Sequence, residues 1–121
     1  MKMDPNVKEK WIKALRSGEY RKGFDYLKTG TQKESFCYLG VLTDIYIEEH
    51  SLEWESGEDG IFKFGGTSMC LAPEVMEWSG LDDAEDSLLY RGGKWGIVDI
   101  SDDRDYSLPF EEFADLVEDQ L

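Results

Sequence analysis

The sequence Phe36-Cys-Tyr-Leu-Gly-Val-Leu-Thr-Asp-Ile-Tyr-Ile-Glu-Glu49 is the strongest structural signal in the chain. Its apolar side chains recur at helical spacing and cover much of the helix circumference, which predicts a helix at the centre of the domain. Ser35 precedes this segment and is the expected N-cap. Because a glycine inside a helix costs about 1 kcal/mol relative to alanine, we expect another backbone to pack closely against Gly40.

Two amphipathic helices are expected nearer the chain ends. The first is predicted from Pro5 to Ser17, with Asp4 as its N-cap and Gly18 after its end. The last is predicted from Pro109 to about Gln120, with apolar residues on one face and acidic residues on the other. Three helices of this kind can enclose one hydrophobic core.

Strand patterns fill much of the remaining chain. Two apolar runs separated by Gly92-Gly93 are typical of a hairpin. The alternating residues on either side of the turn Ser56–Gly60 predict a second hairpin. The expected segments are an extended piece at Phe24–Leu27, a polar loop at Lys28–Glu34, a hairpin of Ser51–Glu55 and Ile61–Phe64, a short helix at Pro73–Trp78, and a hairpin of Ser87–Arg91 and Lys94–Ile100. The prediction is a single α+β domain over residues 1–121, with N-terminal, central and C-terminal helices packed on β-hairpins.

Charge is distributed unevenly along the chain, whose formal net charge is −14. Residues 1–33 hold nine basic and four acidic side chains, a balance of +5, whereas residues 34–121 hold four basic and 23 acidic ones, a balance of −19. A field of this sign repels nucleic acid and anionic membranes and favours encounter with basic protein surfaces. General solubility or a salt-adapted source would account for the same charge without a binding role.

Membrane spans, a signal peptide and paired cysteines are the sequence features that bear on where a protein is located. No apolar run approaches the roughly 20 residues that span a bilayer, and the N-terminus lacks the apolar region of a signal peptide. We therefore expect a cytoplasmic protein that stays where it is made. Cys37 and Cys70 lie in apolar sequence, which predicts free, buried thiols.

Catalytic and metal-binding patterns are weak. His50 is the single histidine, which argues against the usual zinc sites. On one helix it would lie about 20 Å from Cys37, too far for a catalytic pair. The run 99–105 has oxygen side chains at alternate positions, as in a calcium loop, but Arg104 replaces the required glycine. No catalytic residue, metal site or cofactor is predicted, and enzymatic activity is the least favoured hypothesis.

Four sequence blocks carry a resemblance to a known family. They are Trp11–Tyr20, Phe36–Tyr46, Leu71–Leu81 and Phe110–Asp115. Together they resemble a family of small proteins encoded in phage and prophage genomes. The chain departs from that pattern at Tyr38 and Thr43, where relatives frequently have cysteine. The resemblance implies a phage origin and a setting in the host cell, and it implies no activity.

Two functional hypotheses follow. The favoured one is a phage accessory protein that binds and inhibits a host protein with a basic surface. A surface that normally holds nucleic acid is an example. Its contacts would come from the acidic loops, through Glu58, Asp59, Asp82, Asp83, Glu85, Asp86, Asp102, Asp103 and Asp105.

The alternative hypothesis is a small-ligand pocket, with a nucleotide as one candidate ligand. Aromatic and cationic side chains crowd into one short stretch, and the pocket would be lined by Trp11, Tyr20, Arg21, Lys22 and Tyr26. Direct nucleic-acid binding by the basic N-terminal segment is less favoured. Pairing of that segment with the acidic remainder of the same chain explains it more simply.

Overall fold

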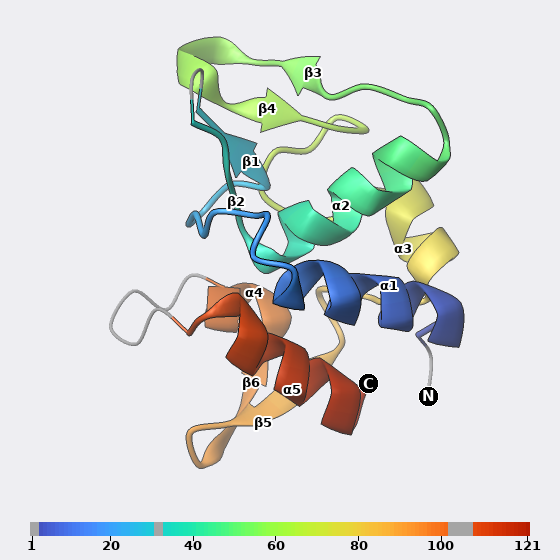
Figure 1. The fold of residues 1–121 in the computed structure, drawn as a ribbon, viewed down its shortest axis with the longest axis vertical. Helices are drawn as coiled ribbons and strands as arrows, with labels where there is room; N and C mark the ends of the chain where they lie inside the picture. Colours follow the sequence, from blue (N-terminus) through green and yellow to red (C-terminus); the bar gives the residue numbers. More distant parts are fainter. Residues whose placement is uncertain (1–2, 31–32, 102–107) are drawn as a thin grey trace.

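Helix α2 (Tyr38–Glu49) lies beside α1 (Pro5–Arg16), and α5 (Phe110–Gln120) covers the other side of α1 (Figure 1). The computed structural model describes residues 3–30, 33–101 and 108–121. The remaining elements are β1 (Lys28–Thr29), β2 (Ser35–Phe36), β3 (Glu55–Ser56), the 3-10 helix η1 (Glu58–Gly60), β4 (Phe62–Lys63), α3 (Pro73–Ser79), β5 (Ser87–Tyr90), β6 (Gly93–Gly96) and α4 (Ile97–Ser101). Helices and short antiparallel hairpins confirm the predicted α+β class.

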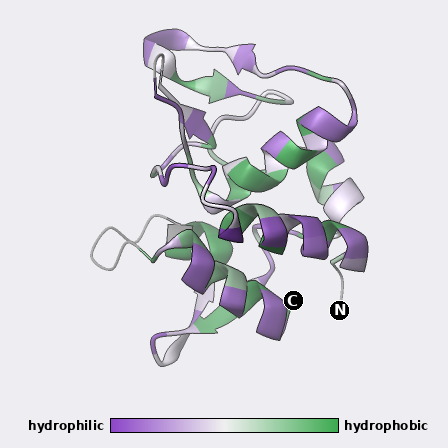
Figure 2. Cartoon of the chain, in the orientation of Figure 1, coloured by the Kyte–Doolittle hydropathy of each residue, from purple (hydrophilic) through white to green (hydrophobic). Residues whose placement is uncertain are grey.

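The start of α1 follows the predicted cap. The Asp4 carboxylate accepts hydrogen bonds from the backbone N–H groups of Asn6 and Val7 at 2.8 and 3.1 Å, which satisfies two of the free donors at the helix start. The inner stripe of α1 buries Trp11 and Leu15 completely or nearly so. Figure 2 shows hydrophilic residues on the visible sides of α1 and α5, and hydrophobic ones along α2.

Three aromatic side chains join α1, α2 and α5 at the centre of the core. The rings of Tyr38 and Phe113 stack with centroids 3.8 Å apart, and Trp11 meets Phe113 edge to face at 5.5 Å. The Trp11 indole N–H donates to the carbonyl of Tyr38 at 3.0 Å. These contacts pin α1 and α5 to the start of the central helix.

The central helix is buried as predicted, but its start was predicted wrongly. Cys37 is the N-cap, and its sulfur accepts from the Gly40 N–H at 3.4 Å. Ser35, the expected cap, belongs to β2 with Phe36. Phe36 cannot begin the helix because its N–H donates to Arg21 and its carbonyl accepts from Gly23. These longer-range contacts override the local helical pattern.

The hairpins are shorter than expected, and the first one was missed. β1 pairs with β2, β3 with β4, and β5 with β6, each pair antiparallel. The segment Phe24–Leu27 contains no strand, and the predicted loop 28–34 begins with β1. A strand of two residues carries no alternation that a sequence pattern could reveal. Its pairing arises from tertiary contacts.

The segment after Gly96 was also assigned wrongly. It was predicted as a continuing strand but forms α4. Ile97 and Ile100 are 0% and 1% exposed, and their spacing of three places both on one side of a helical turn. The predicted Gly92-Gly93 hairpin is confirmed, with Tyr90 opposite Gly93, as is α3, which ends at Gly80 in the left-handed conformation.

The helices of the described ranges are all short or polar in part. None of them is both long enough and apolar enough to cross a membrane.

Candidate functional site

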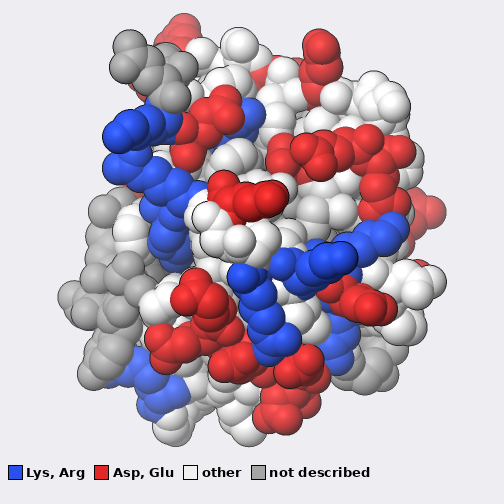
Figure 3. Space-filling view, viewed as in Figure 1, with Lys and Arg blue, Asp and Glu red and all other residues white. Residues whose placement is uncertain are grey.

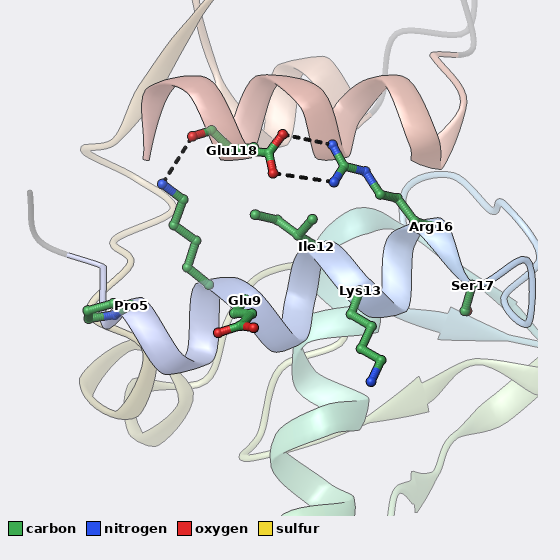
Figure 4. A pocket seen from close by; sticks show the side chains of 8 residues that line it. Pro5, Glu9, Ile12, Lys13, Arg16, Ser17 and Glu118 are labelled. Atoms are coloured by element: carbon green, nitrogen blue, oxygen red, sulfur yellow. Dashed lines mark hydrogen bonds and ion pairs between the residues drawn. The ribbon is translucent and has the colours of Figure 1, made fainter.

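A groove of 790 Å³ runs along the exposed side of α1 next to α5 (Figure 4). Ile12 lies in the middle of the groove. Lys8 and Arg16 reach across it to α5, and Lys13 points away from α5. The lining residues are Pro5, Lys8, Glu9, Ile12, Lys13, Arg16, Ser17 and Glu118. The groove is therefore a seam between a basic helix and an acidic one.

Salt bridges cross this seam. The Arg16 guanidinium donates to the Asp115 carboxylate at 2.7 Å and to both oxygens of Glu118 at 3.1 and 3.4 Å. The Lys8 ammonium donates to the backbone carbonyl of Glu118 at 3.2 Å, near the C-terminal end of α5. A cation at this end offsets the negative pole of the helix.

The same contacts shift the pKa values of the pair. The hydrogen bond from Arg16, followed by its charge, lowers the pKa of Glu118 below the ordinary value of 4.5. Hydrogen bonds to Glu118 and Asp115 raise the pKa of Arg16. Because the folded-state pKa of Glu118 is depressed, its contribution to stability is present above pH 4.5 and is lost as pH falls through the lower folded value.

Glu118→Gln is expected to lower the melting temperature slightly at pH 7 and to have a smaller effect toward pH 3. As the pH falls through the lowered pKa of Glu118, the wild-type carboxyl becomes protonated and no longer pairs as an anion with Arg16. Thermal unfolding of both proteins between pH 7 and pH 3 measures the difference. Glu112→Gln on the same helix is the matched control, since Glu112 is exposed and forms no salt bridge with a described residue. An equal effect of Glu118→Gln at both pH values would contradict the pairing.

Pairing of the basic N-terminal segment with acidic residues of the same chain is thus confirmed in part. Besides Arg16, Lys10 pairs with Glu49 at the end of α2 at 2.9 Å. Lys13 makes no salt bridge with any described residue. Figure 3 shows the blue side chains of α1 as a band with red side chains over α5 below it and over the end of α2 above it.

The predicted ligand pocket does not form from its five residues. Trp11 is 0% exposed and belongs to the core. The Tyr20 hydroxyl donates to Asp44 at 2.7 Å, and burial together with this bond raises the pKa of Tyr20.

The other three members of that set also lie apart from a common cavity. Lys22 lies over the ring of Phe24, 4.0 Å from its centroid, and Arg21 is exposed. Tyr26 lines a different hollow, beside Glu58 and Asp59. The crowding of these residues in sequence therefore does not bring them together around one ligand.

The acidic loop after α3 has a structural role. One Asp82 oxygen accepts from the N–H groups of Ala84 and Glu85, and Asp86 accepts from the Asp82 N–H at 2.8 Å. Asp83 is 8% exposed and accepts from the Leu71 N–H at 2.8 Å. Asp83 was predicted as a partner contact, and the structure places its carboxylate in a buried position where it is bonded to the backbone of Leu71.

The other acidic residues predicted as partner contacts lie outside this loop. Glu58 and Asp59 are exposed in η1. Asp102, Asp103 and Asp105 lie outside the described residues, as does most of the run 99–105.

A set of carboxylates that shares Glu58 and Asp59 with the predicted one stands out, which we call the acidic edge. It comprises Glu48, Glu53, Glu55, Glu58 and Asp59, all exposed and none in a salt bridge with a described residue. They follow one another from the last turn of α2 through β3 to η1, and red side chains appear over this region at the top of Figure 3. The sequence signal for the set is the lack of lysine and arginine between residues 34 and 62.

The cysteines and the histidine lie in separate places. Cys37 is buried, but Cys70 is exposed, contrary to the prediction. His50 caps the end of α2 and stacks on Tyr46 with centroids 4.1 Å apart. Cys37 and His50 thus occupy opposite ends of one helix. Within the described ranges, no three His, Cys, Asp or Glu side chains are grouped so as to hold a metal ion.

Comparison with known proteins gives one match. Residues 3–121 match the model of a family described as a domain of unknown function (DUF8296). No curated protein matches the chain, and no solved structure does.

Proposed function

The chain belongs to the DUF8296 family, and we propose that it acts as a stoichiometric binder of a protein with a basic surface. The acidic edge supports this proposal. Its five exposed carboxylates form no salt bridge with a described residue, although Lys63 lies opposite Glu55 across β3 and β4, whereas the cations of α1 are largely engaged with α2 and α5. The carboxylates of the acidic edge therefore face solvent. Their negative charge attracts a basic protein surface and accelerates the encounter with that protein.

The placement of charge at the end of α2 also favours a binding role. The last turn of this helix holds Glu48 and Glu49 and no basic residue. Carboxylates at a helix C-terminus interact unfavourably with the helix dipole, by a few tenths of a kcal/mol to about 1 kcal/mol each. Lys10 offsets this for Glu49 alone. Glu48 is left as a charge that costs stability. Proteins accept such local costs at functional sites.

The biological setting is proposed from the resemblance to phage proteins. A binder made in an infected cell would meet host proteins, and a basic surface that normally holds nucleic acid is one target that an acidic edge would cover. We propose inhibition of such a host protein as the consequence of binding.

Neutralising the acidic edge is expected to weaken partner binding at least about fivefold. The change combines Glu48→Gln, Glu53→Gln, Glu55→Gln, Glu58→Gln and Asp59→Asn. Exposed ion pairs contribute roughly 0.2–1 kcal/mol each, so five together exceed about 1 kcal/mol. Immobilised wild type captures the partner from an extract of the native cell at low salt, and titration with the purified partner gives the dissociation constants.

A second variant with the same change in net charge is the control. It carries Glu19→Gln, Glu77→Gln, Glu111→Gln, Glu112→Gln and Asp119→Asn, all at exposed positions that do not belong to the edge. This control is expected to bind within about twofold of wild type. An equal loss of affinity in both variants would mean that only the overall charge matters. If wild type captures no protein at either low or high salt, the proposal is wrong.

A further inference from the structure

Three aromatic rings surround the ammonium group of Lys28. Its Nζ atom lies 4.5 Å from the ring centroid of Phe62, 5.4 Å from that of Trp54 and 5.6 Å from that of Phe36. Glu34 completes the enclosure at 3.1 Å from Nζ. All three rings are within the roughly 6 Å at which a cation is attracted to an aromatic face. We call these three rings and Glu34 the cage.

The hairpins hold the cage together from several segments. Lys28 pairs with Phe36 across β1 and β2, and Phe62 lies on β4 opposite Ser56 of β3. A backbone hydrogen bond of 2.8 Å from Gly30 to Gly60 ties the first hairpin to η1. The Trp54 indole N–H donates to Asp44 at 2.9 Å, which fixes the ring. The cage is therefore preformed by the fold.

The occupant of the cage is largely buried, whereas its carboxylate partner is half exposed. The Lys28 side chain is 11% exposed, and that of its partner Glu34 is 47% exposed. An apolar residue of similar length would fill the same space without the cost of desolvating a charge.

The cage and the acidic edge share segments of the chain. Trp54 stands between Glu53 and Glu55 in the sequence, and Phe62 follows η1, which carries Glu58 and Asp59. A lysine of a basic partner that is attracted to this edge approaches the segments that carry the rings. The edge supplies long-range attraction, and the cage supplies short-range recognition of an alkylammonium group.

We infer that the cage is a binding site for alkylammonium groups, which Lys28 occupies in the free protein and a lysine side chain of the partner occupies in the complex. This inference rests on the proposed function, since it names the chemical group that the partner presents. When the partner's ammonium group replaces that of Lys28, the contacts with the rings and with Glu34 are conserved. The carboxylates of the edge then favour the complex over the free protein.

The probe for this exchange is n-butylammonium chloride, which reproduces the end of a lysine side chain. The readout is the NMR signal of the Trp54 indole N–H during titration, with n-butanol and sodium chloride as matched controls. Lys28→Ala is expected to bind n-butylammonium saturably and at least about tenfold more tightly than wild type. Wild type is expected to show the same direction of shift at higher probe concentration, because Lys28 competes. Neither protein is expected to respond in this way to n-butanol or salt.

Phe62→Leu in the wild-type background tests the cage if Lys28→Ala does not fold. It is expected to weaken n-butylammonium binding about threefold or more, as expected for loss of about 0.5–2 kcal/mol of cation–π attraction. Failure of Lys28→Ala to bind the probe better than wild type would overturn the site. A wild-type signal that never shifts would show Lys28 to be a fixed part of the core and would overturn the exchange. Both results leave capture of a partner by the acidic edge intact, so the two proposals fail separately.

Discussion

Gly40→Ala is expected to lower the free energy of unfolding by about 3 kcal/mol or more. A Cβ atom at this position would lie 1.7 Å from the carbonyl oxygen of Leu27 and 2.6 Å from its carbonyl carbon. The backbone at Leu27 cannot yield easily, because its N–H donates to Ser68 at 2.7 Å and its carbonyl accepts from Cys37 at 3.3 Å. Overpacking of a core costs about 1–3 kcal/mol and more where rigid backbone is struck. The gain of about 1 kcal/mol in helix propensity is smaller.

Urea unfolding followed by circular dichroism measures this loss. Gly18→Ala is the control, because Gly18 has a φ of +77° and nothing within 4 Å of an added Cβ. Its cost is expected to be only the strain of a left-handed alanine, about 1–2 kcal/mol. A Gly40→Ala protein as stable as wild type would contradict the close packing of the segment before β1 against α2.

Trp11→Ala is expected to destabilise the protein by about 3–5 kcal/mol, the range for a large aromatic side chain removed from a core. Trp11 is fully buried, contacts Phe113 and donates to the Tyr38 carbonyl. Trp11→Phe keeps most of the volume and loses the hydrogen bond, so we expect a smaller cost of about 1–3 kcal/mol. Chemical unfolding of both variants measures which of them loses more stability.

This series also separates a core residue from a ligand-binding one. A ligand-binding tryptophan would leave stability nearly unchanged when it is removed. Destabilisation of Trp11→Ala by less than about 1 kcal/mol would therefore contradict the placement of Trp11 at the junction of α1, α2 and α5.

The helices were predictable because their signals are local. Asp4 and Pro5 mark the start of α1, and the apolar stripes of α1 and α5 match the faces that the fold buries. The packing role of Gly40 could also be anticipated, since a glycine inside a buried helix usually marks a place where a second backbone comes close. Each of these predictions needs only residues within one element.

The start of α2 and the small hairpins were not predictable in the same way. Phe36 fits a helical stripe, yet hydrogen bonds to Arg21 and Gly23 draw it into extended backbone. Ile97 and Ile100 fit a strand as well as a helix, because a short apolar run is ambiguous between the two. Contacts distant in sequence decide these cases.

The candidate site shows the same division. The excess of basic residues before position 34 led to the expectation of internal pairing, which Arg16 and Lys10 fulfil. Whether a carboxylate faces solvent or caps a turn depends on its hydrogen bonds, so Asp83 and Glu53 look equivalent in the sequence and differ in the fold. The cage and the Lys28 that it encloses come from four segments of the chain and leave no pattern that could be recognised in the sequence.

Carbodiimide cross-linking of the complex locates the partner on the surface of the protein, because the reagent joins carboxylates to lysine ammonium groups that touch. Mass spectrometry then identifies which carboxylates became linked to the captured partner. We expect the links to fall on Glu48, Glu53, Glu55, Glu58 or Asp59. Links confined to α5 or to the loop at residues 82–86, with none on the acidic edge, would contradict the proposed binding surface.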